Sequence, residues 1–178
     1  PIYNEEHGIE EFYRRTKVVL RLLEPRFSHE LIFVNDFSKD NTLEKLYELA
    51  EKDTSVKVIN FSRNFGNQMG ITAGIDYSKG DIAVVIDDDL QDPPEIIFNL
   101  ISKWSQGFKV VYGLRPNRKG VNPIFKLLAK TYYRLIGSLS DTQIPKDTGD
   151  FRLIDRVVIE TLKLMREENR YYRGLVAW

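Results

Sequence analysis

The sequence predicts one α/β domain with a mostly parallel β-sheet flanked by helices. Short runs rich in β-branched residues alternate along the chain with segments whose apolar residues recur at helical spacing. This alternation is typical of a sheet whose strands are connected by covering helices. The 178 residues, 42% of them hydrophobic and 29% charged, suffice for a single soluble domain with a substantial core.

Four helices are predicted from the spacing of the apolar residues. They cover residues 9–23, 41–52, 67–78 and 95–105. Pro25 ends the first helix, and either Asp40 or Asn41 can cap the second. Gly80 closes the third helix, and the Pro93–Pro94 pair suits the first turn leading into the fourth.

Four strands are predicted between these helices. They cover residues 30–36, 56–61, 81–87 and 109–113. The third strand, DIAVVID, is apolar enough to be buried on both faces. Polar residues end three of the strands: Asn35 and Asp36; Ser62, Arg63 and Asn64; and Asp87, Asp88 and Asp89. Because ligands bind beyond the carboxyl ends of parallel strands, we expect a site where these residues converge.

The adjacent aspartates after the third strand predict a metal site. Carboxylates packed behind a buried strand repel one another without a cation, and they are ligands that Mg²⁺ or Mn²⁺ prefers. If the strand persists, Asp87 and Asp89 point to one side and Asp88 to the other. Asp87 and Asp89 are therefore the predicted ligand pair, with Gln91 or Asp92 as a neighbour. An acidic solvated turn, with Asp92 capping the next helix, is the alternative.

Composition excludes several other kinds of site. The absence of cysteine excludes a disulfide scaffold, a thiolate nucleophile and cysteine-ligated zinc, and His7 and His29 lack the spacing of metal ligands. Lys plus Arg equals Asp plus Glu at 26 each, and we expect no nucleic-acid partner. No apolar run approaches the roughly 18 residues of a membrane span. The chain opens at Pro1 without Met and closes at Trp178 in an apolar run, so we expect truncation at both ends.

Five motifs together resemble the family 2 glycosyltransferases of the GT-A (Rossmann-like) fold. They are P-x-Y-N-E-E (residues 1–6), VNDFSKDNT (34–42), FSRNFGNQMGITAG (61–74), DDDLQDPPE (87–95) and GDFRLIDR (149–156). Within this family the chain is similar to the polyprenyl-phosphate glycosyltransferases, the group of dolichyl-phosphate mannose synthases and bactoprenol glucosyltransferases. The resemblance covers nearly the whole chain, so that one catalytic domain over residues 1–178 is expected.

The resemblance implies a role for each matching position. It assigns nucleotide-sugar binding to Pro1, Tyr3, Glu5, Asp36, Asp87 and Asp88, with Asp36 at the base. It assigns the metal and the diphosphate to Asp87, Asp89 and Gln91. It assigns catalysis to Asp150, Asp89 and Arg152, the last also near the acceptor phosphate. Two departures stand out. The family often has Gly where Phe37 stands, and the family's first strand, which precedes the P-x-Y-N-E-E motif, is absent.

A basic segment follows the fourth strand. No acidic residue occurs between Glu95 and Asp141, and three basic residues four apart form one stripe: Lys126, Lys130 and Arg134. Residues 121–137 therefore predict an amphipathic helix on a membrane surface, although a core-packed helix with a solvated basic side fits this pattern equally. Arg115 and Arg118 are candidates to hold an acceptor phosphate bidentately.

Two further motifs are left without a catalytic role. RNFGNQMG is neither a Walker nor a dinucleotide fingerprint, and Gly70 and Gly74 suit close packing of a helix on a sheet. Tyr171 and Tyr172 fit either the core or the acceptor side.

The expected reaction is inverting transfer of a sugar, in the first place glucose from UDP-glucose, to a polyprenyl phosphate with Mg²⁺ or Mn²⁺. The acceptor phosphate is already anionic, so Asp150 would orient a substrate rather than remove a proton. Alternatives are a sibling enzyme with another donor (GDP-mannose, UDP-N-acetylhexosamine or UDP-aminoarabinose type) or a soluble acceptor, and a non-catalytic, receiver-like Mg²⁺ module. The resemblance implies a membrane-associated, cytoplasmic catalytic domain with transmembrane helices after Trp178. The oligomeric state, including a homo-oligomer, stays open.

Overall fold

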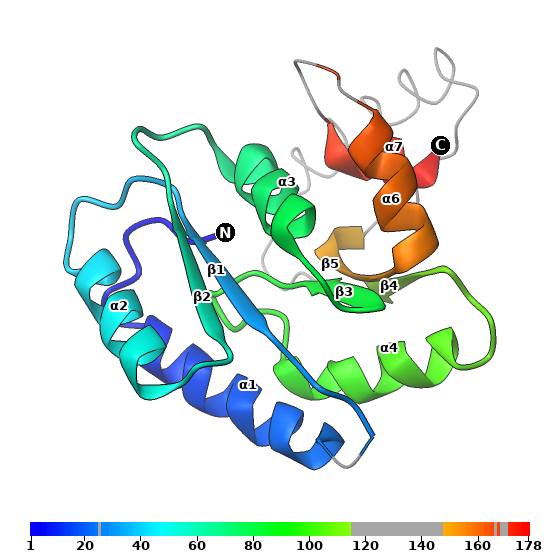
Figure 1. The fold of residues 1–178 in the computed structure, drawn as a ribbon, viewed down its shortest axis with the longest axis horizontal. Coiled ribbons are helices and arrows are strands. Elements are labelled where there is room, and N and C mark those ends of the chain that lie inside the picture. Colours follow the sequence, from blue (N-terminus) through cyan, green and yellow to red (C-terminus); the bar gives the residue numbers. More distant parts are fainter. Residues whose placement is uncertain (25, 115–147, 166, 168–170) are drawn as a thin grey trace, which may run out of the picture.

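The structure is a computed structural model that describes residues 1–24, 26–114, 148–165, 167 and 171–178 (Figure 1). The predicted helix at 121–137, its basic stripe, and the candidate phosphate ligands Arg115 and Arg118 lie outside the described residues.

The four helices and four strands predicted between residues 9 and 113 are all present. The helices are α1 (Ile9–Leu23), α2 (Thr42–Lys52), α3 (Asn67–Tyr77), the short 3₁₀ helix η1 (Pro94–Ile96), α4 (Ile97–Trp104), α6 (Arg156–Leu164) and α7 (Tyr172–Ala177). The strands are β1 (Leu31–Asn35), β2 (Val56–Asn60), β3 (Ile82–Val85), β4 (Val110–Leu114) and β5 (Thr148–Asp155). The α/β class is confirmed, and β5, α6 and α7 add elements that were not predicted.

The strands form two groups. β1 and β2 pair in parallel, from Leu31 opposite Val56 to Asn35 opposite Asn60. In the second group β5 lies between β3 and β4 and is antiparallel to both. β5 is thus the exception to the parallel order expected from the sequence. Its insertion brings the GDFRLID motif beside the end of β3.

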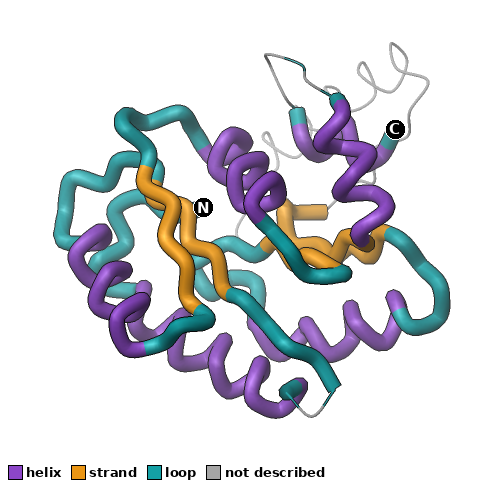
Figure 2. Tube along the Cα trace, in the orientation of Figure 1, coloured by secondary structure: helices purple, strands orange, loops and turns teal. Residues whose placement is uncertain are grey.

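Helices cover both faces of the strands, as Figure 2 shows. Successive residues of β5 point to opposite faces, because side chains alternate along a strand. Leu153 joins a core cluster with residues of α1 and α4, whereas Ile154 joins one with residues of α3, α6 and α7. The strand is therefore buried on both sides, and it can carry polar side chains only where these find partners.

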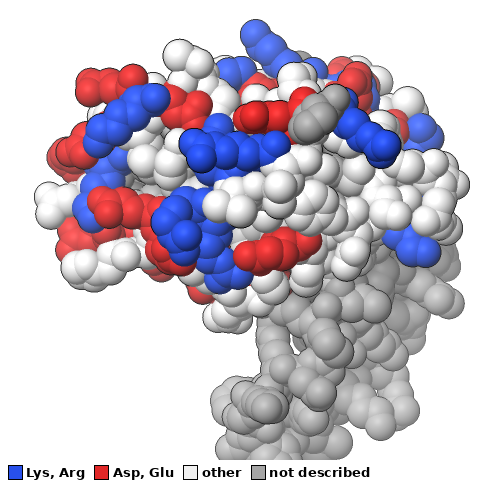
Figure 3. Space-filling model, turned by 90° about the horizontal axis from the view of Figure 1, so that it is seen from below, with Lys and Arg blue, Asp and Glu red and all other residues white. Residues whose placement is uncertain are grey.

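The face on the α1 side of the molecule carries interleaved charges of both signs (Figure 3). On α1, Arg14 pairs with Glu11, Arg15 reaches Glu95, and Glu10 accepts from Lys45. Within the described residues, no helix is long and apolar enough to cross a membrane.

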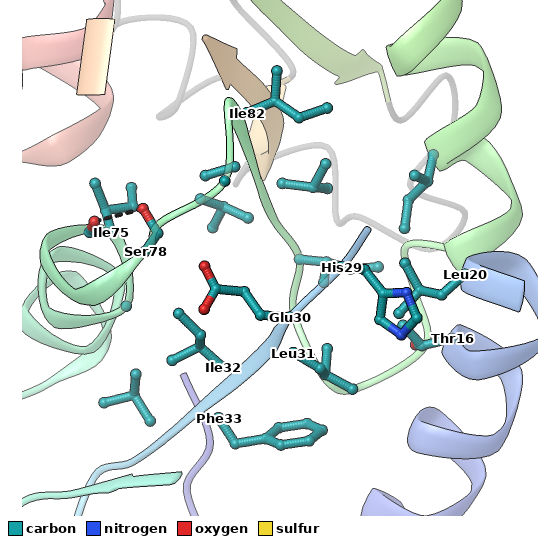
Figure 4. Close-up of a pocket in the computed structure, with 18 of the residues that line it drawn as sticks. Thr16, Leu20, His29, Glu30, Leu31, Ile32, Phe33, Ile75, Ser78 and Ile82 are labelled. Carbon is teal, nitrogen blue, oxygen red and sulfur yellow. Dashed lines mark hydrogen bonds between the residues drawn. The ribbon is translucent and has the colours of Figure 1, made fainter. Parts of the chain in front are cut away.

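An apolar slot of about 230 Å³ separates the two groups of strands (Figure 4). Residues 31–34 of β1 and 82–86 at β3 line its two sides, and α1 and α3 contribute further side chains. Most of the lining is apolar, although Thr16, His29, Glu30 and Ser78 also border the slot, and Asp88 and Pro1 border it at the edge described next.

Candidate active site

Hydrogen bonds between the P-x-Y-N-E-E motif (residues 1–6) and the VNDFSKDNT motif (34–42) form one side of the site. The backbone N–H of Ile2 donates to the carbonyl of Val34 (2.8 Å), and Ile2 pairs in parallel with Asn35 at the end of β1. The N–H of Asn4 donates to Ser38 Oγ (2.9 Å), and the Asn4 side chain accepts from the N–H of Lys39 (2.8 Å). These contacts hold the loop that carries Tyr3, whose side chain is left 48% exposed at the rim.

Asp36 is buried at the end of β1 and organises the next loop. Its two carboxylate oxygens accept from the backbone N–H groups of Phe65 (2.6 Å) and Gly66 (2.8 Å). Gly66 has φ +87° and ψ 161°, a region that is almost restricted to glycine. Asp36 therefore fixes the turn before α3 and keeps acceptor capacity on each oxygen, because a carboxylate oxygen accepts about two hydrogen bonds.

The departure from the family pattern at Phe37 has a structural explanation. Phe37 has φ +64°, in the left-handed region that favours glycine. The ammonium group of Lys39 lies 3.5 Å from the centre of the Phe37 ring, a cation–π contact that offsets part of the strain. The loop thus keeps the backbone shape for which glycine would be suited.

The aspartates after β3 lie in a turn and not on the strand. β3 ends at Val85, before the first of them, and Leu90 has φ +56°. The strand alternation expected for Asp87 and Asp89 is therefore wrong, because the strand does not persist. Asp89 is exposed and accepts from the N–H of Gln91 (3.0 Å), whereas Asp87 and Asp88 are half-buried.

The buried carboxyls of this turn bind their protons more tightly than usual. Burial raises the pKa of Asp87, and the negative charges of Asp150, Asp89 and Asp92 raise it further. Burial also raises the pKa of Asp88 to about 6. Asp88 Oδ2 is buried without a hydrogen-bond partner in the structure. Such a group is stabilised by an approaching cation or donor.

Asp150 on β5 faces this turn. The pairing of β3 with β5 ends at Val85 opposite Arg152, and Asp87 just beyond it is close enough to Asp150 for the two charges to repel each other. Asp150 is 2% exposed, and Arg173 from α7 donates Nε to its Oδ1 and Nη2 to its Oδ2, both at 2.8 Å. Burial alone would raise the pKa of Asp150, but the bonds and charge of Arg173 lower it below its usual value.

Arg152 is almost completely buried, with 1% of its surface exposed. Its Nε donates to the carbonyl of Asp150 (3.2 Å), and its Nη2 donates to that of Gly149 (3.1 Å). The guanidinium also lies over the rings of Tyr112 and Tyr172. These contacts fix the start of β5, and Nη1 of Arg152 is left buried without a hydrogen-bond partner in the structure.

Three residues at the site were not identified from the sequence: Asn67, Gln68 and Arg173. Asn67 Nδ2 donates to Asp150 Oδ2 (3.4 Å), and Gln68 Oε1 accepts from the N–H of Tyr172 (3.0 Å). The first two belong to the RNFGNQMG motif, whose polar side chains at the start of the predicted helix were the available signal. Tyr172 is a core residue, and Tyr171 is 49% exposed.

The predicted aspartates converge on one place. The backbone nitrogen of Pro1 is within electrostatic reach of Asp36, Asp87, Asp88 and Asp150. Pro1 also packs closely on α3, where a Cβ on Gly70 would lie 2.7 Å from the Pro1 Cβ. We call this edge, defined by Asp36, Asp87, Asp88, Asp89 and Asp150, the aspartate rim.

The chemistry of the rim fits a divalent cation only if other ligands complete its shell. Within the described residues, no group of three His, Cys, Asp or Glu side chains is arranged to hold a metal. Asp87 and Asp89 supply carboxylate oxygens, and Gln91 is exposed beside them. Magnesium-like ions commonly bind one or two carboxylates together with substrate phosphates, so this donor set suits that arrangement.

Comparison with known proteins decides the family. Residues 1–163 match the sequence model of the family described as Glycosyl transferase family 2. The chain belongs to glycosyl transferase family 2. The enzyme class expected from the motifs, a glycosyltransferase, is thereby confirmed.

Curated relatives of this family 2 chain cover it completely. It is 51% identical over 178 residues to the uncharacterized glycosyltransferase YkcC of Bacillus subtilis, and it spans 54% of that protein. It is 38% identical over 178 residues to the prophage bactoprenol glucosyl transferase homolog of Escherichia coli, of which it spans 58%. The chain therefore spans little more than half the length of these relatives.

Solved structures of glycosyltransferases share the fold of this family 2 chain. TarS of S. aureus (residues 1–349) aligns with a TM-score of 0.62 and 16% identity, over 99% of this chain and 52% of that one. Glucosyl-3-phosphoglycerate synthase of Mycobacterium tuberculosis aligns with a TM-score of 0.57 and 21% identity, over 89% of this chain and 55% of that one. The predicted GT-A fold is confirmed.

Proposed function

We propose that this chain is the catalytic domain of an enzyme that transfers glucose from UDP-glucose to a polyprenyl phosphate, with inversion at the anomeric carbon. The observation that carries the proposal is the aspartate rim, where the half-buried Asp87 and Asp88, whose pKa values are raised, lie close to the buried Asp150. The relatives named bactoprenol glucosyl transferase, 38% identical over the whole chain, support the choice of sugar and lipid.

The nucleotide would bind between the first two motifs. The exposed ring of Tyr3 offers a surface on which a base can stack, and Asp36 lies at the end of the adjoining strand. Since each Asp36 oxygen already accepts one backbone N–H, it can accept one more bond from the N–H of a uracil ring. Glu5, whose backbone N–H donates to Thr42 Oγ1 (2.8 Å), would border the bound nucleotide.

Asp87 and Asp89, with Gln91 beside them, would hold a Mg²⁺ or Mn²⁺ ion together with the donor diphosphate. When bound, such an ion neutralises the charge that develops on the departing diphosphate. Related folds support a divalent ion: a mannosyltransferase of Pyrobaculum calidifontis was crystallised with GDP-Man and Mn²⁺, at a TM-score of 0.59 and 20% identity.

The acceptor phosphate would be bound by Arg115 and Arg118, with the 121–137 helix on the membrane surface. A guanidinium can donate two parallel hydrogen bonds to a phosphate, so Arg152 also stays a candidate for this contact. The polyprenyl phosphate is anionic at neutral pH and attacks the anomeric carbon without a strong base. The protein would therefore be membrane-associated through its acceptor.

Titration calorimetry with UDP-glucose, with and without Mn²⁺, tests the donor site. We expect Mn²⁺-dependent binding that falls at least about tenfold in Asp87→Asn and in Asp89→Ala, because each removes a charged ligand of the bound ion. Asp81→Asn, at the exposed opposite end of β3, is the control and should bind normally. Full transfer by Asp89→Ala with metal present would contradict the metal role.

GDP-mannose serves as the competing donor in the same titration. Tighter binding of GDP-mannose than of UDP-glucose would keep the proposed site but identify the alternative, a sibling enzyme that uses another donor.

Replacement of Lys126, Lys130 and Arg134 by Gln tests the acceptor. Binding to anionic liposomes should weaken if the acceptor is a lipid, whereas an enzyme with a soluble acceptor would be unaffected. The receiver-like module has no support, since the family match extends over residues 1–163.

A further inference from the structure

Asp150 is bonded on both oxygens by side chains from three separate elements. Arg173 of α7 makes the two short bonds of 2.8 Å, and Asn67 of α3 donates to Oδ2 at 3.4 Å. Arg152, on the same strand, donates Nη2 to Oδ1 at 3.4 Å. Each oxygen thus accepts one short bond from Arg173 and one long contact of 3.4 Å, so it is held firmly by Arg173 and can still accept a hydrogen bond from a sugar hydroxyl.

The helix that carries Arg173 is itself anchored to the donor side of the molecule. Gln68 Oε1 accepts the N–H of Tyr172 (3.0 Å), and the Tyr172 ring is buried in the core with Ile71 and Ile75 of α3. The packing of Tyr172 against α3 therefore holds the neighbouring Arg173 guanidinium beside Asp150. Arg173 has 32% of its side chain exposed, so it lies between the buried carboxylate and the outside.

We infer that Arg173 is a positioning residue: it fixes Asp150 in one orientation near Asp87, and Asp150 then orients the reacting sugar without acting as a base. This inference rests on the proposed transferase function. A forked pair fixes both the place and the plane of the carboxylate, which a single hydrogen bond cannot do. The role also explains the polar start of α3, since Asn67 and Gln68 complete the same arrangement.

The charges around Asp150 require such a partner. Asp87 approaches it from the turn after β3, Arg152 lies on its own strand, and Arg173 comes from α7. Without Arg173, the buried Arg152 would be the remaining close cation among the described residues, and two carboxylates would lie near each other across the site. Asp150 would then turn away from Asp87, which displaces the group that orients the sugar.

A double-mutant cycle on transfer tests the inference. Arg173→Gln, Arg173→Lys, Asp150→Asn and the double variant Asp150→Asn/Arg173→Gln are assayed in membranes that contain the whole protein, with UDP-glucose and a polyprenyl phosphate. We expect Arg173→Gln to lower kcat about 10- to 100-fold with the KM for UDP-glucose changed less than about threefold, since misplacement costs rate rather than donor binding. Arg173→Lys should recover part of the loss.

The double variant is the decisive measurement. If Arg173 acts through Asp150, adding Arg173→Gln to Asp150→Asn lowers kcat no further. If the two losses multiply, Arg173 acts on the substrate independently and the inference is wrong. A raised KM with unchanged kcat, or an unaffected Arg173→Gln, would also overturn it.

Arg14→Gln is the matched control, because Arg14 makes the same forked pair with Glu11 on the exposed face of α1 (2.7 Å for each bond). It should transfer at the wild-type rate. Should Arg173→Gln fail to fold by thermal unfolding, Arg173→Lys and Asn67→Ala carry the cycle instead. If the wild type transfers no sugar from any donor, both the proposed function and this inference are wrong. If the wild type is active and the losses of the two single variants multiply, only the inference is wrong.

Discussion

Strained backbone is concentrated in the loops around the aspartate rim. Among the described residues other than glycine, positive φ values occur at Asn4, Phe37 and Leu90, one in each loop that borders the site. A left-handed conformation costs a non-glycine residue about 1–2 kcal/mol. The surroundings compensate, since Asn4 is bonded through its backbone and side chain and Leu90 packs against the core. Strain of this kind is typical of sites where the chain must hold a defined shape.

Gly66 gives a sharp test of backbone strain at one residue. A Cβ there would meet no atom within 4 Å, so the effect of Gly66→Ala comes from φ +87° alone. We expect the free energy of unfolding, measured by urea denaturation, to fall by about 1–3 kcal/mol. UDP-glucose should also bind more weakly, because the loop that donates to Asp36 is displaced.

Gly74→Ala is the matched control for this substitution. Gly74 is in α3, and its added Cβ would make an ordinary contact of 3.5 Å with Val34 Cγ2. Alanine is favoured over glycine inside a helix, so this variant should be more stable than wild type by about 0.5–1 kcal/mol. Equal destabilisation of both variants would show that backbone strain is not the cause.

At the scale of elements, a buried polar network ties α1 to the loop before β2. Lys17 Nζ donates to Asp53 Oδ2 (2.9 Å), to His29 Nε2 (2.9 Å) and to Ser55 Oγ (3.2 Å). Tyr13 adds a hydrogen bond from its hydroxyl to Asp53 Oδ2 (2.8 Å). Because Lys17 donates to Nε2, the His29 ring is neutral and carries its proton on Nδ1.

This network predicts how stability depends on pH. Burial, followed by the charge of Lys17, lowers the pKa of His29. The unfolded chain therefore binds a proton, near pH 6.5, that the folded chain does not, and stability is lost as the pH falls from about 7 to 5. The slope from this one proton is at most about 1.4 kcal/mol per pH unit.

The measurement is urea unfolding of wild type, His29→Gln and His7→Gln between pH 5 and pH 7. His29→Gln should flatten the slope in this range. His7→Gln should keep the wild-type slope, since the His7 side chain is 94% exposed. An unchanged slope in His29→Gln would assign the pH dependence to other groups. The lowered pKa of Asp53, caused first by Lys17, adds a further loss of stability below about pH 4 in every variant.

For the whole molecule, the central feature is the contact between the first residues and α3. The segment at Pro1 and Ile2 lies beside the end of β1, next to the slot between the two groups of strands, and Gly70 of α3 packs directly against Pro1. This contact connects the position of α3, which carries Asn67 and Gln68, to the loop that carries Tyr3. The two sides of the proposed donor site are thus placed by one close approach.

Gly70→Ala should separate these two sides. Its Cβ would lie 2.7 Å from the Pro1 Cβ, and the rigid proline ring forces the chain at Pro1 or α3 to move. We expect the affinity for UDP-glucose with Mn²⁺ to fall about tenfold while far-ultraviolet circular dichroism stays native. Wild-type affinity in Gly70→Ala would show that the segment at Pro1 does not contribute to the donor site.

The fold was predictable from sequence because its signals are local. Apolar periodicity and turn residues placed α1, α2 and α3 within one or two residues of their observed bounds. β5 was missed as a strand because Asp150 and Arg152 are polar residues on a buried face. Only their partners, Arg173 and the ring of Tyr112, make that burial possible. Those partners are distant in sequence, so no local pattern reveals them.

The sequence by itself determined the order of the helices and strands up to β4, the family and the carboxylates that are candidates for the chemistry. Only the tertiary structure decided what each carboxylate can do. Asp89 is exposed, Asp88 is half-buried with an unpartnered oxygen, and Asp150 is enclosed by donors. The physical reason is that the charge and pKa of an aspartate depend on its burial and on the groups within a few ångströms, and these come from segments that only folding brings together.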